Sequence, residues 1–252
     1  MATAERHEVR AGETVRGKAD GAAGTKLVLL RLEISPAGTV ASRLAEGEGN
    51  AAGEFALELP ATAVPTAAGR KCALEYVVRS VPDKKREAAD LLRVQVAGRL
   101  KAGVMPEFYG YGDRIIARFE ARRFHIELHE ADVQGGGQLA GRVHLHPGKT
   151  ANGLVVTCRC LESWRVNGRS VVHNRRQPPL WKTEAIWSES VPLEWRDGET
   201  WSAFRVPVPE GLPPAVEARS IAWRYEVEAR CATRLGMHDT AVTTPMGFEI
   251  RS

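Results

Sequence analysis

Short runs of alternating apolar and polar residues recur along the chain, and Gly, Pro, Asn and Asp bound them. Clear examples are 55–59 and 204–208, in which every second residue is large and apolar. A period of two is typical of half-buried strands, whereas long stretches with the helical period are absent. The best helix candidates are 84–92 and 113–123, two or three turns each. The pattern predicts an all-β protein, and the many turn residues favour a sandwich over a barrel.

A block in the first half of the chain recurs in the second half. Phe55–Pro60 and Tyr76 match Phe204–Pro209 and Tyr225 at a constant separation of 149 residues (204 minus 55, 225 minus 76). In both blocks alternate apolar residues would face a core, the proline would end the strand, and the later Tyr-containing strand would pair back. A repeat of this kind predicts two copies of one structural unit.

An earlier block fixes the extent of the two copies. Residues 9–17 match 133–141 at a separation of 124 (133 minus 9). We therefore predict tandem immunoglobulin-like β-sandwiches at residues 1–100 and 120–252, with 101–119 as a linker. The linker contains apolar and aromatic residues, so we expect it to dock rather than to act as a flexible tether. The residues expected to be buried there are Met105, Phe108, Tyr109, Ile115, Ile116 and Phe119.

The two separations differ by 25 residues (149 minus 124), which places an insertion at about 164–188 in the second copy. The insertion holds three of the six tryptophans, and its five basic residues and one acidic residue give a net charge of +4, equal to that of the whole chain. Trp and Arg are the residue types enriched in interface hot spots. We predict that Arg175, Arg176, Trp181 and Trp187 bind a partner. A hairpin whose tryptophans cap its own sandwich is an equally open reading.

The repeated strands also resemble a known family. In the second copy a glycine-framed strand at 136–145, a strand at 204–209 and an Ile-to-Val strand at 221–227 follow one another. This succession resembles the amino-terminal half of arrestin-like proteins. The first copy fits more loosely, since nothing in it corresponds to Trp164. The resemblance implies tandem sandwiches, as in retromer adaptor subunits and bacterial sporulation-control proteins, and a shared role in non-catalytic protein binding. In arrestins the second sandwich differs from the first, whereas both copies here follow one pattern.

One constellation suggests a metal site. His144 and His146 precede Cys158 and Cys160, and imidazole with thiolate suits zinc. If the two strands form a hairpin that pairs residue 145 with residue 154, the cysteines lie on the apolar face and the histidines point away from them. We therefore predict no metal site, buried cysteines and solvated histidines.

Catalytic motifs are not apparent in the sequence. Ser163, Ser170 and Ser188 lack a G-x-S-x-G context, and the glycines at 135–137 lack the Lys and the helix of a phosphate loop. We predict a non-enzymatic protein without cofactor. An enzyme whose site lies between the two sandwiches stays an open alternative, and a deep cleft lined by His125, Glu127 or His129 would favour it.

Composition limits the class of protein. The 252 residues are 43% hydrophobic and 26% charged, the mean hydropathy is -0.27, and the four cysteines form no C-x-x-C pair. Because the start of the chain lacks an apolar segment behind a basic one, we expect neither a signal peptide nor a membrane span. We predict a cytoplasmic adaptor or scaffold that binds a protein partner. The alternative is a polyanion binder that recognises nucleic acid or an acidic membrane surface through its basic, Trp-rich insertion.

Overall fold

The structure is a computed structural model. It describes residues 7–18, 22–81, 90–97, 117–129, 136–150, 152–166, 180–195, 198–232 and 238–243. The regular elements within these ranges are all β-strands, which confirms the all-β prediction. None of the described residues forms a helix long and apolar enough to cross a membrane.

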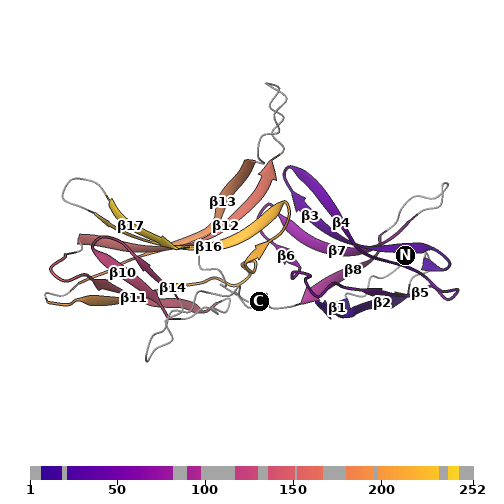
Figure 1. Cartoon of the computed structure of the whole chain (residues 1–252), viewed down its shortest axis with the longest axis horizontal. Helices are drawn as coiled ribbons and strands as arrows, with labels where there is room; N and C mark the ends of the chain where they lie inside the picture. Colours follow the sequence, from indigo (N-terminus) through magenta and orange to yellow (C-terminus); the bar gives the residue numbers. More distant parts are fainter. Residues whose placement is uncertain are drawn as a thin grey trace, which may run out of the picture. The chain divides into compact units, whose positions relative to one another are not determined.

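The chain divides into two compact units, drawn in Figure 1. Unit 1 consists of Met1–Leu100, Ser163–Lys182 and Ala218–Ala222, and unit 2 of Lys101–Glu162, Thr183–Glu217 and Trp223–Ser252. The boundaries predicted from the repeat, including the linker at 101–119, stay a prediction.

The first part of the chain forms two sheets. One has the order β1-β8-β7-β3-β4, with β6 also paired to β7, and the other pairs β2 with β5. The strands are β1 (His7–Arg10), β2 (Thr14–Lys18), β3 (Lys26–Ser35), β4 (Gly38–Glu48), β5 (Glu54–Glu58), β6 (Ala67–Ala68), β7 (Ala73–Ser80) and β8 (Asp90–Ala97).

The second part of the chain also forms two sheets. One has the order β13-β12-β16-β15, with β17 paired to β16, and the other the order β14-β11-β10-β9. The strands are β9 (Ala117–Glu120), β10 (Phe124–Leu128), β11 (Gln138–Leu145), β12 (Asn152–Val166), β13 (Leu180–Pro192), β14 (Trp201–Pro207), β15 (Val216–Glu217), β16 (Ile221–Ala232) and β17 (His238–Thr243).

The repeat seen in the sequence recurs as the same contacts. Gly17 of β2 pairs with Phe55 of β5, and Gly141 of β11 pairs with Phe204 of β14. In both pairs the phenylalanine ring lies over the glycine: a Cβ atom would lie 2.6 Å from Phe55 Cζ at Gly17 and 2.4 Å from Phe204 Cζ at Gly141. The glycines thus make room for buried aromatic rings.

The tyrosines of the repeat make matching hydrogen bonds. The hydroxyl of Tyr76 donates to the carbonyl of Val64 at 2.7 Å, and that of Tyr225 donates to the carbonyl of Pro213 at 2.7 Å. Both acceptors lie twelve residues before their tyrosine. Each bond anchors the Pro-containing segment that precedes the Tyr strand, because it satisfies a carbonyl that the sheet does not use.

A matching turn opens each copy. Gly12 has a φ of +85° and its N–H donates to the carbonyl of Leu59 at 3.1 Å, while Gly136 has a φ of +79° and donates to the carbonyl of Val208 at 2.9 Å. Positive φ values favour glycine, which has no Cβ to clash with the backbone. The separation of 124 residues between the two early blocks therefore reflects a glycine with a positive φ at the same place in each copy.

The core of the second part is filled from both of its sheets. Phe124, Val143 and Phe204 from one sheet pack with Val156 and Tyr225 from the other. This is the face-to-face packing of a β-sandwich.

The predicted hairpin between the strands at 138–145 and 152–160 is wrong. β11 pairs with β10 and β14, whereas β12 belongs to the other sheet. Their apolar faces meet across the core, since Leu139 and Val143 pack in the same cluster as Cys158 and Cys160. Apolar residues alternate in the same way in two strands that pair and in two strands that face each other across a core. The alternation therefore predicted which side of each strand is buried, but not which strand lies beside it. The cysteines are buried, as predicted.

The two segments predicted as helices contain β-strands in their described parts. The described part of 84–92 belongs to β8, and the described part of 113–123 includes β9. In β8, Leu92, Val94 and Val96 are buried at every second position, which is the strand period. The linker residues Met105, Phe108 and Tyr109, with Ile115 and Ile116, lie outside the described residues, and the packing of Phe119 is not described.

A β-bulge interrupts the pairing of β3 with β4. Leu29 pairs with Ala45 and Leu30 pairs with Arg43, so Leu44 is an extra residue on β4. Strand β4 is the last strand in the order of its sheet. A bulge of this kind bends a strand and increases its local twist.

Candidate functional site

Of the four predicted partner-binding residues, the structure describes the two tryptophans. Trp181 lies near the start of β13 with 40% of its surface exposed, and Trp187 is half-buried against the core of the second sandwich. Arg175 and Arg176 lie outside the described residues. Their roles stay a prediction, and the packing of Trp187 makes Trp181 the more accessible aromatic side chain.

The start of β13 is the most exposed stretch of this strand. Four successive residues, Leu180 to Thr183, are exposed, and Leu180 alone has 66% of its surface accessible. Successive strand residues point to opposite faces, so neither face is covered here. Further along, Ile186, Trp187 and Val191 pack on the core and hold the rest of the strand in place.

Strand β13 is also an edge. It pairs with β12 and ends the order of its sheet among the described strands, as Figure 1 shows for the long β12–β13 pair. An edge strand presents unpaired backbone N–H and C=O groups. We call Leu180–Thr183 the β13 edge; it combines a position at the end of the strand order with two large exposed apolar side chains.

A buried tryptophan flanked by lysines supports this edge within unit 1. Trp164 of β12 is 3% exposed, and Lys71 Nζ and Lys182 Nζ each lie 5.4 Å from the centroid of its ring. A cation over an indole is attracted by the negative face of the ring. These contacts concentrate positive charge next to the β13 edge and give Trp164 a structural role.

Sequence reasoning missed Trp201. This residue begins β14 with 48% of its surface exposed, and the guanidinium carbon of Arg142 lies 5.2 Å from its ring centroid. The alternation along β14 could have identified it. Phe204 and Val206 point inward, so the odd-numbered residues of this strand, including Trp201, point outward.

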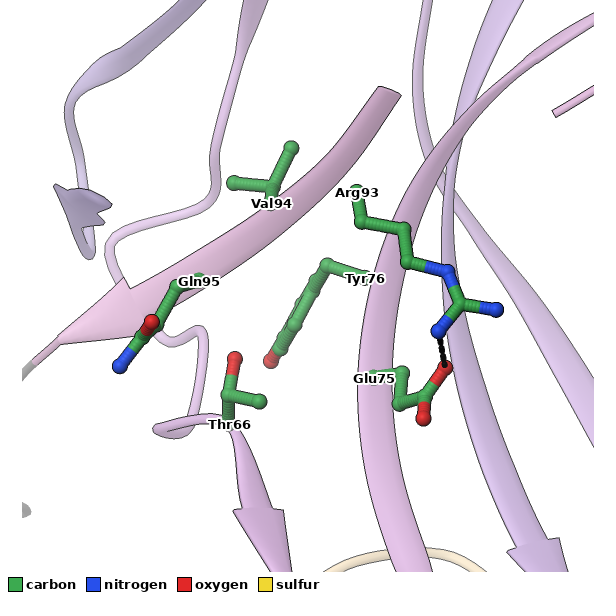
Figure 2. Close-up of a pocket in the computed structure, with 6 residues that line it drawn as sticks. All are labelled: Thr66, Glu75, Tyr76, Arg93, Val94 and Gln95. Atoms are coloured by element: carbon green, nitrogen blue, oxygen red, sulfur yellow. Dashed lines mark ion pairs between the residues drawn. The ribbon is translucent and has the colours of Figure 1, made fainter. Parts of the chain in front are cut away.

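Figure 2 shows a pocket in unit 1. Its volume is about 260 Å³, and the residues that line it are Thr66, Glu75, Tyr76, Arg93, Val94 and Gln95. The guanidinium of Arg93 points to the carboxylate of Glu75 at 3.9 Å. Burial raises the pKa of Tyr76 to about 12, so its hydroxyl stays protonated and bound to Val64. The pocket is smaller than typical ligand cavities of roughly 300–1,000 Å³.

The buried thiols are held in a protonated state. Burial raises the pKa of Cys158 and of Cys160 to about 12, and burial also raises the pKa of Tyr225. Because the thiolate is the nucleophilic form of cysteine, these two residues behave as small apolar core residues.

No family model and no curated protein matches the chain. Among solved structures, the sporulation control protein Spo0M from Bacillus subtilis is similar with 15% sequence identity and a TM-score of 0.36. The match covers 53% of this chain and 50% of that one. A likeness at this level carries no argument about fold or function, so the arrestin-like resemblance stays a prediction.

Proposed function

We propose that this protein is a non-enzymatic adaptor that binds an extended, acidic segment of a partner protein along the β13 edge. The observation that carries the proposal is the exposure of Leu180–Thr183 on the strand that ends its sheet among the described strands. The sequence motifs that resemble arrestin-like proteins imply the same class of role.

The physical basis is strand addition. An extended peptide adds to an exposed sheet edge through main-chain hydrogen bonds, and flanking side chains supply specificity. Trp181 offers a large apolar surface with an indole N–H, the chemistry of an interface hot spot. The net charge of +4 in the insertion favours carboxylates in the added segment, and Arg175 and Arg176 are proposed to contact these carboxylates as bidentate forks.

The proposed place of action is the cytoplasm. The four cysteines are buried and none forms a disulfide within the described part of the chain, as expected where thiols remain reduced.

A capture experiment with matched variants tests the proposal. Full-length wild type, Trp181→Ser and Arg175→Glu/Arg176→Glu would be used to recover partners from the native cell, with recovery quantified by mass spectrometry. We expect both variants to reduce the recovery of one partner at least tenfold. Trp201→Ser is the control, because Trp201 has a similar exposed fraction on a different strand.

The outcomes separate the alternatives. Equal recovery by wild type and Trp181→Ser contradicts the proposal, as does equal loss with Trp201→Ser. A titration of single-stranded DNA and of acidic vesicles tests the polyanion alternative, whose affinity would fall steeply with added salt.

A further inference from the structure

Three histidines and a glutamate gather on the outer face of the β10–β11 pair. His125 of β10 lies directly opposite His144 of β11, and Glu127 follows two residues after His125 on the same face. The intervening residues Phe124, Ile126 and Val143 point into the core. Strand alternation therefore brings this cluster together on the surface that faces away from Cys158 and Cys160.

The distances within the cluster are short. Glu127 Oε1 lies 3.4 Å from His125 Nε2, and Glu127 Oε2 lies 3.1 Å from His144 Nε2. The two imidazole rings stack with their centroids 4.8 Å apart and their planes at 7°. One donor atom from each of the three residues lies within 4.8 Å of the other two.

One nitrogen of the cluster has an unmet bonding capacity. His144 Nε2 is buried and lies 3.1 Å from Glu127 Oε2, yet it makes no hydrogen bond within the described part of the chain. A buried polar atom in that state is unfavourable. A cation between the carboxylate and the imidazole would satisfy both groups.

We propose that His125, Glu127 and His144 bind a divalent transition-metal ion, for which Zn²⁺ is the best match. This inference is independent of the adaptor proposal and replaces the earlier expectation of no metal site. Zinc binds imidazole nitrogen and carboxylate oxygen at about 2.0–2.2 Å in tetrahedral geometry, which separates neighbouring donors by roughly 3.4 Å. The two carboxylate–imidazole distances are close to that separation but involve different oxygens of Glu127, so side-chain rotations are needed to bring the three donors around one ion.

Neighbouring residues support this arrangement. Arg142 lies opposite Glu127 in the strand register, but its guanidinium extends over Trp201 on β14. His146 Nε2 lies 3.1 Å from the carbonyl of Ala121, which fixes the third ring 5.6 Å from His125. Three protein ligands leave a fourth position for water or for a donor from a partner.

A titration of metal-free protein with Zn²⁺ tests the site. The full chain would be stripped with a chelator and titrated calorimetrically with Zn²⁺ alone. We expect one equivalent to bind, and His144→Gln and Glu127→Gln each to weaken the affinity at least tenfold. His129→Gln is the control, because it removes a histidine from the same strand pair that does not belong to the three-residue group. Mg²⁺ should not compete, since it prefers all-oxygen ligands.

A second measurement needs no variant. In a spectrum of the histidine ring nitrogens, Zn²⁺ should shift two of the seven histidine signals, those assigned to His125 and His144. Shifts confined to other histidines would overturn the proposal, as would the absence of stoichiometric binding or an affinity that His144→Gln and His129→Gln lower equally.

Discussion

The two glycine–phenylalanine pairs look alike in sequence and differ in their surroundings. At Gly17 the three atoms nearest to a Cβ atom would all belong to the ring of Phe55. At Gly141 they would include the ring of Phe204 and also the backbone oxygen of Glu127, at 2.5 Å. The reason is that, among the described strands, β2 pairs with β5, whereas β11 lies between β10 and β14. The same local signal is therefore expected to be less sensitive to substitution in the first copy than in the second.

A pair of buried glutamates gives a second comparison. Glu33 of β3 and Glu162 of β12 each follow a leucine, and both are fully buried. Glu33 accepts hydrogen bonds at both oxygens: Oε1 from Arg31, and Oε2 from the N–H and the hydroxyl of Ser220 at 2.6 Å each. Glu162 Oε1 accepts the indole N–H of Trp223 at 3.1 Å. Both β3 and β12 therefore bury a glutamate, and the hydrogen bonds of Glu33 involve both of its carboxylate oxygens.

The largest effect is expected from Glu33→Gln. The NH₂ group of the glutamine would face hydrogen-bond donors, either those of Arg31 or those of Ser220. Removing one partner of a buried ion pair destabilises proteins by about 3–5 kcal/mol. Glu162→Gln is the comparison, because its amide oxygen can still accept a hydrogen bond from the indole N–H of Trp223. Urea denaturation of the two variants measures the difference. Equal losses would show that the glutamates are equivalent.

The next largest effect is expected from alanine at the glycines. Gly141→Ala should lower the unfolding free energy by about 3 kcal/mol and Gly17→Ala by about 1–2 kcal/mol, since overpacking is most unfavourable where backbone must move. Adding Phe55→Leu to Gly17→Ala should recover part of the loss, because the ring is the clashing group. Phe204→Leu should recover less in Gly141→Ala. Equal recovery in both copies would contradict the role assigned to Glu127.

Removing the tyrosine hydroxyls should have a smaller effect. Tyr225→Phe leaves the buried carbonyl of Pro213 without its donor, and we expect a loss of about 1–2 kcal/mol. Tyr76→Phe should lose about 1 kcal/mol, since its bond to Val64 is only partly buried. Thermal unfolding of both variants measures the ranking, and a larger loss at Tyr76 would reverse it.

The smallest effect concerns the core thiols. Because burial raises the pKa of Cys158 and Cys160 to about 12, raising the pH from 7 to 9 produces almost no thiolate at either residue. We expect iodoacetamide to modify neither residue in the folded protein at pH 9 and to modify both in urea. Peptide mass spectrometry measures the extent of modification. Rapid labelling of the native protein would show that the core opens there.

The same residues show how far sequence reasoning reaches. The repeat predicted Gly17, Phe55 and Tyr76 as structural equivalents of Gly141, Phe204 and Tyr225, because their roles depend on local backbone geometry. It could not predict that β11 pairs with β10 rather than β12, since apolar alternation does not encode the pairing partner. The cluster that we propose to bind metal was missed for the same reason: His125 and His144 become neighbours only through that pairing.

The bulge at Leu44 bears on how the molecules behave in concentrated solution. A flat, regular edge invites the edge strand of another molecule, and repetition of that contact leads to aggregates. Strand β4 ends its sheet, but the register shift opposite Leu29 and Leu30 interrupts the regular spacing that a docking strand needs. The exposed Arg43 and Glu46 next to it form an ion pair at 2.6 Å and add charge to the same edge. The bulge therefore discourages self-association through β4, which is not the edge that we propose for partner binding.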